Sequence, residues 1–326
     1  MDVKRTLARE VAKYQEVGLT TYLSQRFLLL CRILKDFASD FIVGRALNRA
    51  SFRCVFERYP DVAHVYKWQY LSRSFSKSDR LRSMVNHYRF IDKHFLPSFM
   101  ASIMYGKILL WEKVKGDNRY SISLTHDEQY REGDLSLLYE VNGEQVYTLA
   151  FAIVPGRVVD MSAAQTLFVS RIQGGFNHYD LIRSSIKAFS GIRPANMLLA
   201  TARAIAIASG ITCITGVRTK HQIALSSKTD AVREEMFDYD RFWMEIGGQK
   251  LDNGQAFSVP ITPDHIPLCD RKREHRFRKM LQYQLESDLI REGRDAFELK
   301  CLKSPTIWRG SPYRQVAETK KRLRKS

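Results

Sequence analysis

The sequence has few cysteines and no long apolar run. Its five cysteines, at positions 31, 54, 213, 269 and 301, are scattered and form no CxxC pair, so neither a zinc cluster nor a disulfide framework is expected. The most apolar short run, residues 27–31, is followed at once by Arg32, far short of the ~20 residues that a membrane-spanning helix requires. The first ten residues mix acids with bases and lack an apolar core, which argues against a secretory signal. We therefore expect a cytoplasmic protein with no transmembrane segment and no bound metal.

The short motifs of several large enzyme and binding classes are also absent. There is no G-x-S-x-G, no Walker A loop, no H-E-x-x-H and no paired-histidine metal spacing. Neither RNP-type aromatic motifs nor C₂H₂ spacing occurs. A reaction therefore cannot be read from a single motif.

What the chain does have is an excess of positive charge, placed at its two ends. The 326 residues contain 52 Lys and Arg against 35 Asp and Glu, a formal net charge of +17. Residues 1–110 hold 19 bases and 9 acids, residues 111–269 hold 16 and 18, and residues 270–326 hold 17 and 8. Basic ends of this kind favour contact with a polyanion such as RNA, lipopolysaccharide or anionic lipid, although they are also compatible with solubility alone.

The first third of the chain has the period of helices. Apolar residues recur at helical spacing in residues 19–37, and shorter stretches follow at 62–71 and 81–90. Pro97 marks the end of this region. We predict a helical, basic N-terminal region over residues 1–110.

The middle of the chain changes to the period of strands. Strand-like runs at 134–141 and 145–154 flank Asn142-Gly143, the strongest short signal for a β-hairpin. An alternating run at 120–124 precedes them, and a further strand over 165–173 ends at two glycines.

Helices and strands then alternate. We predict a helix from Asn177, a second helix over 196–209 closed by Gly210, a buried strand over 211–217, a short helix over 239–246 and a last strand near 257–259. The fold class is thus α+β: N-terminal helices, then a mixed β-sheet with packed helices in a core domain over 111–269, then a basic helical tail over 270–326.

The most pointed local feature is a strand that runs into two glycines ahead of a helix. Arg171, Gln173, Gly174 and Gly175 stand at this turn. Glycines allow the backbone to approach a ligand, and a helix start can hold an anion such as a pyrophosphate. These four residues are the candidate cofactor-binding set, the alternative being a tight bend without a ligand.

Two further residues are candidates for acid–base chemistry. His221 follows the predicted strand 211–217, at the end of the strand where ligands often bind in α/β layers, and its side chain titrates near neutral pH. Glu245 lies on the predicted helix 239–246, away from the apolar face. Either could serve as a general base. The alternatives are a helix-capping or solvated histidine, and a helix whose role is core packing.

The order of elements resembles the core of the GNAT acetyltransferases: an antiparallel hairpin, a long strand with a glycine-bearing turn, a helix, a strand and another helix. The cofactor turn of that family reads R/Q-x-x-G-x-G/A. Arg171 and Gly174 match it, whereas Phe176 stands where Gly or Ala belongs. The resemblance implies coenzyme A or acyl-CoA as the cofactor.

A second resemblance covers most of the chain, from about Tyr66 to about Leu285. It rests on five ordered motifs and a basic run: Arg171-Ile172-Gln173-Gly174-Gly175, Gly191-Ile192-Arg193-Pro194, Gly210-Ile211-Thr212 leading to Gly216-Val217 and His221, Tyr239-x-x-Phe242-Trp243-x-Glu245-x-Gly247-Gly248, Phe257-x-Val259-Pro260, and Lys272-Arg273-Glu274-His275-Arg276. Together they resemble the VirK/YbjX family. The resemblance implies a role in the virulence of enteric bacteria, in resistance to cationic antimicrobial peptides, and in production or surface display of an outer-membrane virulence factor.

Two hypotheses follow. In the first, the chain is a virulence-accessory protein with a GNAT-like core that acts as an acyltransferase, with residues 171–175 at the cofactor phosphates and His221 or Glu245 as the base. In the second, it is a non-catalytic binder of RNA or anionic envelope lipid through its basic ends.

Overall fold

The computed structural model describes residues 37–127, 131–175, 178–224, 237–263 and 273–303. Within these ranges no helix is both long and apolar enough to cross a membrane. The predicted apolar stripe over 19–37 lies outside the described residues except for its last position, and residues 37–47 are helical.

The first third of the described chain is helical, as predicted. It contains the 3₁₀-helices η1 (Ala50–Phe52) and η2 (Pro60–Lys67) and the helices α3 (Arg53–Arg58), α4 (Lys77–His94) and α5 (Phe99–Met104). Helix α4 starts at a capping box, in which Ser76 and Asp79 bind each other's backbone N–H groups. The stretch predicted over 62–71 forms the 3₁₀-helix η2, which begins at Pro60, where a missing N–H costs nothing.

The α+β class is confirmed. The strands are β1 (Ile108–Lys115), β2 (Asn118–His126), β3 (Leu135–Val141), β4 (Glu144–Pro155), β5 (Gln165–Gly174), β6 (Ile214–Val217), β7 (Gln249–Lys250) and β8 (Ala256–Val259). The remaining elements are η3 (Gly156–Val159), α6 (Tyr179–Ala188), α7 (Pro194–Ala208), η4 (Thr219–His221), α9 (Tyr239–Glu245) and α10 (Arg273–Cys301).

Within the described residues, the strands form one sheet of eight, in the order β1-β2-β3-β4-β5-β6-β8-β7. Strands β1 to β5 form an antiparallel meander, β5 and β6 are parallel, and β8 is antiparallel to both β6 and β7. The predicted hairpin is β3–β4. Asn142 and Gly143 both have positive φ angles, of 54° and 88°, as a two-residue turn that follows the twist of the strands requires.

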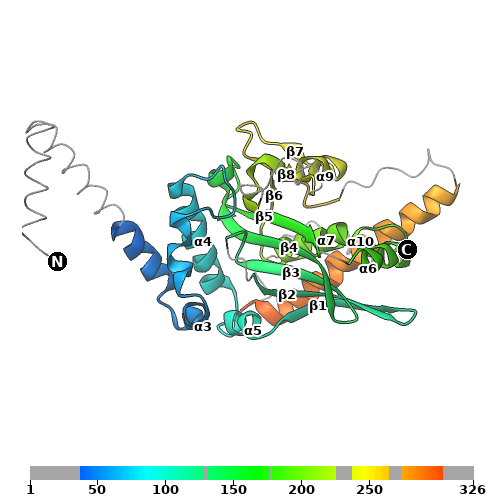
Figure 1. Ribbon diagram of the computed structural model, residues 1–326, viewed down its shortest axis with the longest axis horizontal. Coiled ribbons are helices and arrows are strands. Elements are labelled where there is room, and N and C mark those ends of the chain that lie inside the picture. Colours follow the sequence, from blue (N-terminus) through cyan, green and yellow to red (C-terminus); the bar gives the residue numbers. More distant parts are fainter. Residues whose placement is uncertain (1–36, 128–130, 176–177, 225–236, 264–272, 304–326) are drawn as a thin grey trace, which may run out of the picture.

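Helices lie on both sides of this sheet (Figure 1). The elements of residues 37–104 gather on one side, where α4 contacts β4. On the other side α7 contacts β3, β4 and β5, and α10 contacts both α7 and β1. Helix α7 is almost wholly buried because its residues are mostly small or apolar.

The sheet has one apolar and one polar face at its centre. Cross-strand partners share a face, so Leu124, Leu137, Leu149 and Ile172 lie together, as do Thr125, Ser136, Ala150 and Arg171. The second set is unusual because two of its residues, Ser136 and Arg171, are polar and buried. This polar face forms the main candidate site.

Candidate functional site

Strands β5 and β6 separate soon after they pair. Their parallel pairs are Leu167–Ile214, Phe168–Thr215 and Val169–Gly216, whereas β5 continues to Gly174. An irregularity lies at the same point: Ala150 opposes Arg171 and Phe151 opposes Val169, so the residue between them, Ser170, is an extra residue in β5. Such a bulge bends a strand and changes its twist.

A tyrosine from α9 lies in the gap that results. The hydroxyl of Tyr239 is 3.1 Å from the backbone nitrogen of Ile172, whose N–H it accepts, and 3.2 Å from the Ile172 carbonyl oxygen, to which it donates. Burial raises the pKa of Tyr239, so it stays protonated. Next to it, the indole of Trp243 packs so close to Gly216 that a Cβ there would lie 2.3 Å from a ring atom, and its Nε1 donates to the Val217 carbonyl at 2.8 Å. Side chains of α9 therefore replace the missing strand contacts.

The glycine turn after β5 is tightly packed. A Cβ on Gly174 would lie 2.9 Å from the ring of Tyr147, and one on Gly175 would lie 2.3 Å from the imidazole of His178. Gln173 is exposed, and α6 begins at Tyr179. The structure thus brings Gln173, Gly174 and Gly175 to the start of a helix.

Arg171 points elsewhere, into a buried cluster of charges on the polar face. Its Nη2 lies 2.6 Å from Asp127 Oδ2 and its Nη1 lies 2.9 Å from Glu132 Oε2, and the side chain is only 8% exposed. Ser136 donates to the same Asp127 oxygen, and the Nε2 of Gln222 donates to Glu132 Oε1 at 2.6 Å. Buried ions are tolerated when they are paired and hydrogen-bonded in this way.

A third carboxylate stands behind this cluster. Asp134 is fully buried and accepts hydrogen bonds from the hydroxyls of Tyr70 and, at 2.9 Å, Tyr88. Burial raises the pKa of Asp134, while the two hydroxyls and His126 oppose the rise. These contacts join the N-terminal helices to the start of β3.

A cavity of about 260 Å³ opens beside the charge cluster. Its lining comes from β2 and the residue after it, and from β3, β4 and β5: Thr125, His126, Asp127, Ser136, Leu138, Gln145, Thr148 and Arg171. Gln145 is exposed and Leu138 is half-buried, whereas Asp127 and Arg171 are buried. The cavity therefore has a mouth near the β3–β4 hairpin and a charged floor.

His126, at the end of β2, is the least satisfied polar group of this wall. It is 5% exposed, and neither ring nitrogen has a hydrogen-bond partner. The imidazole stacks on Tyr59 with ring centroids 5.2 Å apart. Burial lowers the pKa of His126, although Asp134 and Asp127 act in the opposite direction, so the ring is neutral near pH 7.

The two predicted bases occupy different surroundings. His221 is half-buried in η4, and burial together with Lys220 and Arg218 lowers its pKa. Glu245 ends α9, where Arg193 lies 3.2 Å from one carboxylate oxygen and Arg241 lies 3.1 Å from the other. His221, Glu245 and Arg171 thus have different charged neighbours in the part of the chain that the structure describes. It is Gln222, the residue after His221, that reaches the charge cluster.

Sequence reasoning missed four residues of this region: His126, Asp127, Glu132 and Tyr239. The first three lie close together in the chain, whereas Tyr239 lies more than a hundred residues further on. A polar His-Asp pair directly after an alternating strand was a usable signal for the first two. Tyr239 was assigned to an apolar helix face, which is where its ring lies, but its hydroxyl bonds a strand.

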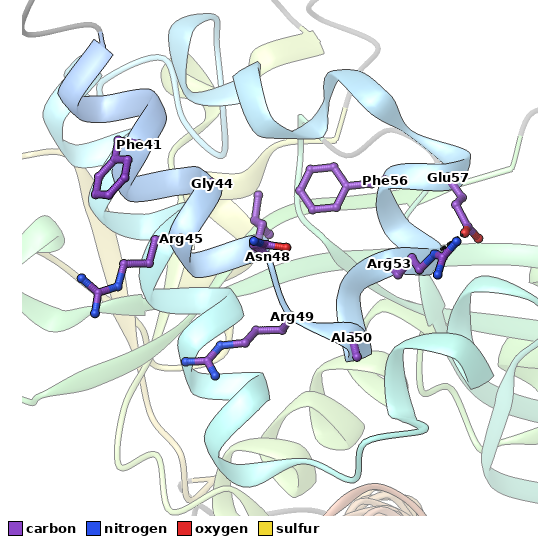
Figure 2. Close-up of a pocket in the computed structure, with 10 residues that line it drawn as sticks. Phe41, Gly44, Arg45, Asn48, Arg49, Ala50, Arg53, Phe56 and Glu57 are labelled. Carbon is purple, nitrogen blue, oxygen red and sulfur yellow. Dashed lines mark hydrogen bonds and ion pairs between the residues drawn. The ribbon is translucent and has the colours of Figure 1, made fainter.

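A second hollow lies among the N-terminal helices (Figure 2). It measures about 810 Å³, and its lining is both basic and apolar: Phe41, Gly44, Arg45, Leu47, Asn48, Arg49, Ala50, Arg53, Phe56 and Glu57. Figure 2 shows Phe41 and Arg45 on one helix and Phe56 on α3. We call this hollow the basic groove. Among the described residues, no group of three or more His, Cys, Asp or Glu could hold a metal ion.

Fold and site together define an α+β protein with an open, mostly antiparallel sheet and a buried charge cluster on its polar face. The chain belongs to the family described as "Protein of unknown function (DUF535)", whose model matches residues 21–289. This is the VirK/YbjX family, so the family resemblance seen in the sequence is confirmed.

Two similar proteins come from Haemophilus influenzae (strain ATCC 51907 / DSM 11121 / KW20 / Rd), and each bears the name "Uncharacterized protein". One is 23% identical over 214 residues, which cover 64% of this chain and 69% of the relative. The other is 21% identical over 243 residues, which cover 73% and 76%. No solved structure matches the chain.

Proposed function

We propose that the chain is an acyltransferase that uses a coenzyme A thioester, with a sheet arranged like the GNAT core. Support comes from the order of the elements: a meander β1–β5, the glycine turn, a helical region, the parallel strand β6 and the helix α9. The helical region departs from that core, because two helices, α6 and α7, stand where the core has one. The proposal rests mainly on the point where β5 and β6 stop pairing, at Val169 and Gly216. Beyond this point the backbone of Ile172 bonds the hydroxyl of Tyr239 and not a neighbouring strand.

The residues at this gap fit the two parts of coenzyme A. Its pantetheine arm carries amides, which can bond the N–H and C=O of Ile172 in place of Tyr239. Its phosphates suit Gln173, Gly174, Gly175 and the start of α6, where backbone N–H groups favour an anion. When bound, coenzyme A supplies the activated acyl group. Arg171 takes part indirectly, through the charge cluster on the polar face.

The reaction also needs a base. In acyl transfer the acceptor nitrogen or oxygen bonds to the acyl carbon, the carbon–sulfur bond breaks, and the acceptor proton passes to a base while the sulfur gains a proton. We propose His221 or Glu245 for this role. We expect one of two variants, His221→Ala or Glu245→Gln, to remove the base. That variant should lower the transfer rate by about 10²–10⁴-fold without lowering the affinity for acyl-CoA.

Binding is the first test. A thermal-shift titration with coenzyme A, acetyl-CoA and a long-chain acyl-CoA is run on the wild type, Gly175→Leu and Gly44→Leu. The atoms nearest to a Cβ at Gly175 belong to the side chain of His178, and no atom lies within 4 Å of a Cβ at Gly44. We expect both variants to fold, which circular dichroism checks. We expect a saturable rise in melting temperature for the wild type and Gly44→Leu, and none for Gly175→Leu.

Tyr239→Phe sharpens this test. The variant removes the hydroxyl that competes for Ile172, so the free protein melts at a lower temperature and acyl-CoA raises that temperature by more than it does in the wild type. If no coenzyme A species shifts the melting temperature of either protein, the acyltransferase proposal fails.

In the cell, we propose a cytoplasmic virulence-accessory role that affects the envelope, antimicrobial-peptide resistance and production or display of an outer-membrane factor. The family resemblance supports this setting. In a deletion strain, wild type and Gly44→Leu restore peptide resistance, whereas Gly175→Leu leaves the strain sensitive. Restoration by Gly175→Leu would separate the phenotype from acyl transfer.

The basic groove favours a second function, the binding of an anionic lipid. Arg45, Arg49 and Arg53 line the groove together with two phenylalanines, a combination that suits a charged head group beside an acyl chain. Phe37 and Phe41, at the start of the described helix, are 71% and 63% exposed. The lining is too apolar to favour RNA over lipid.

Vesicle flotation tests this alternative. We expect the wild type to float with phosphatidylglycerol vesicles but not with phosphatidylcholine vesicles, and to dissociate as salt rises. Arg45→Glu and Gly44→Leu weaken flotation, and Gly175→Leu serves as the control that does not. Binding to RNA with no binding to either vesicle would contradict the lipid assignment.

A further inference from the structure

Helix α10, the longest helix that the structure describes, lies on the outside of the molecule. Its inner side packs on α7 and β1, and Leu289, Gly293 and Phe297 are buried there. Figure 1 shows that the first turns of α10 extend beyond the neighbouring helices. The opposite side of the helix is exposed, so it is available to a partner.

This exposed side is apolar at both of its ends. Near the start of α10, Phe277, Met280 and Leu281 are 60%, 48% and 39% exposed, and near its end Leu299 is 79% exposed. Phe277 and Leu299 are separated by about six turns, or about 33 Å, and therefore lie on the same side of the helix. Single exposed apolar residues are ordinary, whereas a cluster of them favours an interaction surface.

The centre of the exposed side is polar and charged. Gln284, Asp288 and Glu292 follow Phe277 and Leu281 at helical spacing. Arg291 contacts Asp288 at 3.0 Å and Glu292 at 3.2 Å. These acids disfavour an anionic membrane, and the ion pairs disfavour a wholly apolar groove. The pattern instead fits a partner that is also apolar at two ends and polar between them.

A second copy of α10 running in the opposite direction has this pattern. When Phe277 of one protomer faces the partner's Leu299, the reverse contact forms at the other end, and Asp288 lies midway between them. The end near Leu299 offers further apolar surface: Lys300 donates to the carbonyl of Leu109 at 2.6 Å, and Leu109 is itself 38% exposed. Contacts that repeat in this way are those of a closed twofold dimer.

The charge of the helix also favours the antiparallel direction. Residues 276–285 contain three bases and no acid, whereas residues 286–301 contain five acids and three bases. An antiparallel pair brings the basic end of each copy beside the more acidic part of the other, and it opposes the two helix dipoles. A parallel pair would bring the two basic ends together.

We propose that the chain forms a homodimer through antiparallel α10 helices, in which Phe277 of each protomer contacts the partner's Leu299. This surface is separate from the acyl-CoA gap and from the basic groove, so the inference does not rest on the proposed function.

Sedimentation of the full chain over about 5–200 µM tests the dimer. We expect the wild type to dimerise with a dissociation constant of about 100 µM or lower. Leu299→Glu and Phe277→Glu place a charge at the apolar contact and should raise that constant by about tenfold or more. Met244→Glu is the matched control, because Met244 is 60% exposed but lies on α9, and it should change the constant by less than about twofold. Circular dichroism checks that each variant folds.

Disulfide cross-linking with oxidised glutathione tests the direction and register. Oxidation of Asp288→Cys alone should link two copies, because this position lies at the centre of the pair. A mixture of Phe277→Cys and Leu299→Cys should link one copy of each, whereas either variant alone should give no more dimer than the wild type, which reports the background from the native cysteines.

Each outcome supports or overturns the dimer. A wild type that stays monomeric throughout this concentration range overturns the proposal, and so does a dimer that neither Leu299→Glu nor Phe277→Glu weakens. Stronger linking in Phe277→Cys alone than in the mixture contradicts the antiparallel direction. Dimerisation with the expected cross-links supports it, whether or not acyl-CoA binds.

Discussion

The buried charge cluster predicts a large and specific loss of stability in Arg171→Met. The guanidinium of Arg171 contacts Asp127 at 2.6 Å and Glu132 at 2.9 Å, and all three side chains are at least nine-tenths buried. Methionine fills much of the same space but removes the positive charge that contacts both buried carboxylates. Removing one partner of a buried ion pair costs about 3–5 kcal/mol, a large part of the ~5–15 kcal/mol that stabilises a typical domain.

Urea unfolding followed by circular dichroism measures this loss. The matched control is Arg291→Met, because Arg291 pairs with Asp288 at 3.0 Å but is 60% exposed. An exposed pair contributes about 0–1 kcal/mol, so the two variants should differ by several-fold in their loss of unfolding free energy.

A triple variant separates charge from packing. Adding Asp127→Asn and Glu132→Gln to Arg171→Met removes the two negative charges while it keeps side chains that can hydrogen-bond Ser136 and Gln222. We expect the triple variant to recover most of the lost stability. If Arg171→Met loses less than about 1 kcal/mol, or if the triple variant is less stable than the single one, the cluster does not hold the charges as described.

Three further predictions concern the scaffold. Gly216→Ala forces a Cβ to within 2.3 Å of the Trp243 ring and should cost about 1–3 kcal/mol in urea unfolding. Ser76→Ala breaks the capping box of α4 and should cost about 1 kcal/mol in the same assay. Burial lowers the pKa of His87 from 6.5 to about 3, and its Nδ1 accepts the N–H of Ile153. Because the unfolded state binds the proton more tightly, the free energy of unfolding should fall as the pH drops from 6.5 toward 3, by up to about 1.4 kcal/mol per pH unit. His87→Asn keeps an acceptor but does not titrate, so this variant should show a flatter dependence on pH.

Much of the scaffold could be predicted from local sequence. The Asn142-Gly143 pair specified the β3–β4 hairpin because few residues tolerate two successive positive φ angles. The helix before Gly210 was also predicted, although it begins at Pro194, two residues earlier than expected. Strand β6 is shorter than the apolar run over 211–217, since only 214–217 finds a partner strand.

Other elements carried no local signal. Strand β1 was not predicted, because its residues, which include Glu112, Lys113 and Lys115, lack regular alternation. The separation of β5 from β6 depends on pairing between segments more than forty residues apart, which no local pattern encodes. The charge cluster joins Asp127, Glu132 and Arg171 in the same way.

The extra residue in β5 accounts for the position of both the gap and the cluster. Side chains alternate along a regular strand, so Val169 and Arg171 would share one face. Because Ser170 is inserted between them, Val169 shares a face with its partner Phe151, and Arg171 shares a face with its partner Ala150. Ala150 and Phe151 are successive residues of β4, so Val169 and Arg171 lie on opposite faces of the sheet. Without the bulge the guanidinium would be turned toward the apolar face that α7 covers. The Ser170 hydroxyl also donates to the carbonyl of Glu132, which fixes the segment that supplies the counter-ion. One inserted residue thus turns Arg171 to its carboxylates and, at the same point of the strand, begins the separation from β6 that leaves the backbone of Ile172 to bond Tyr239.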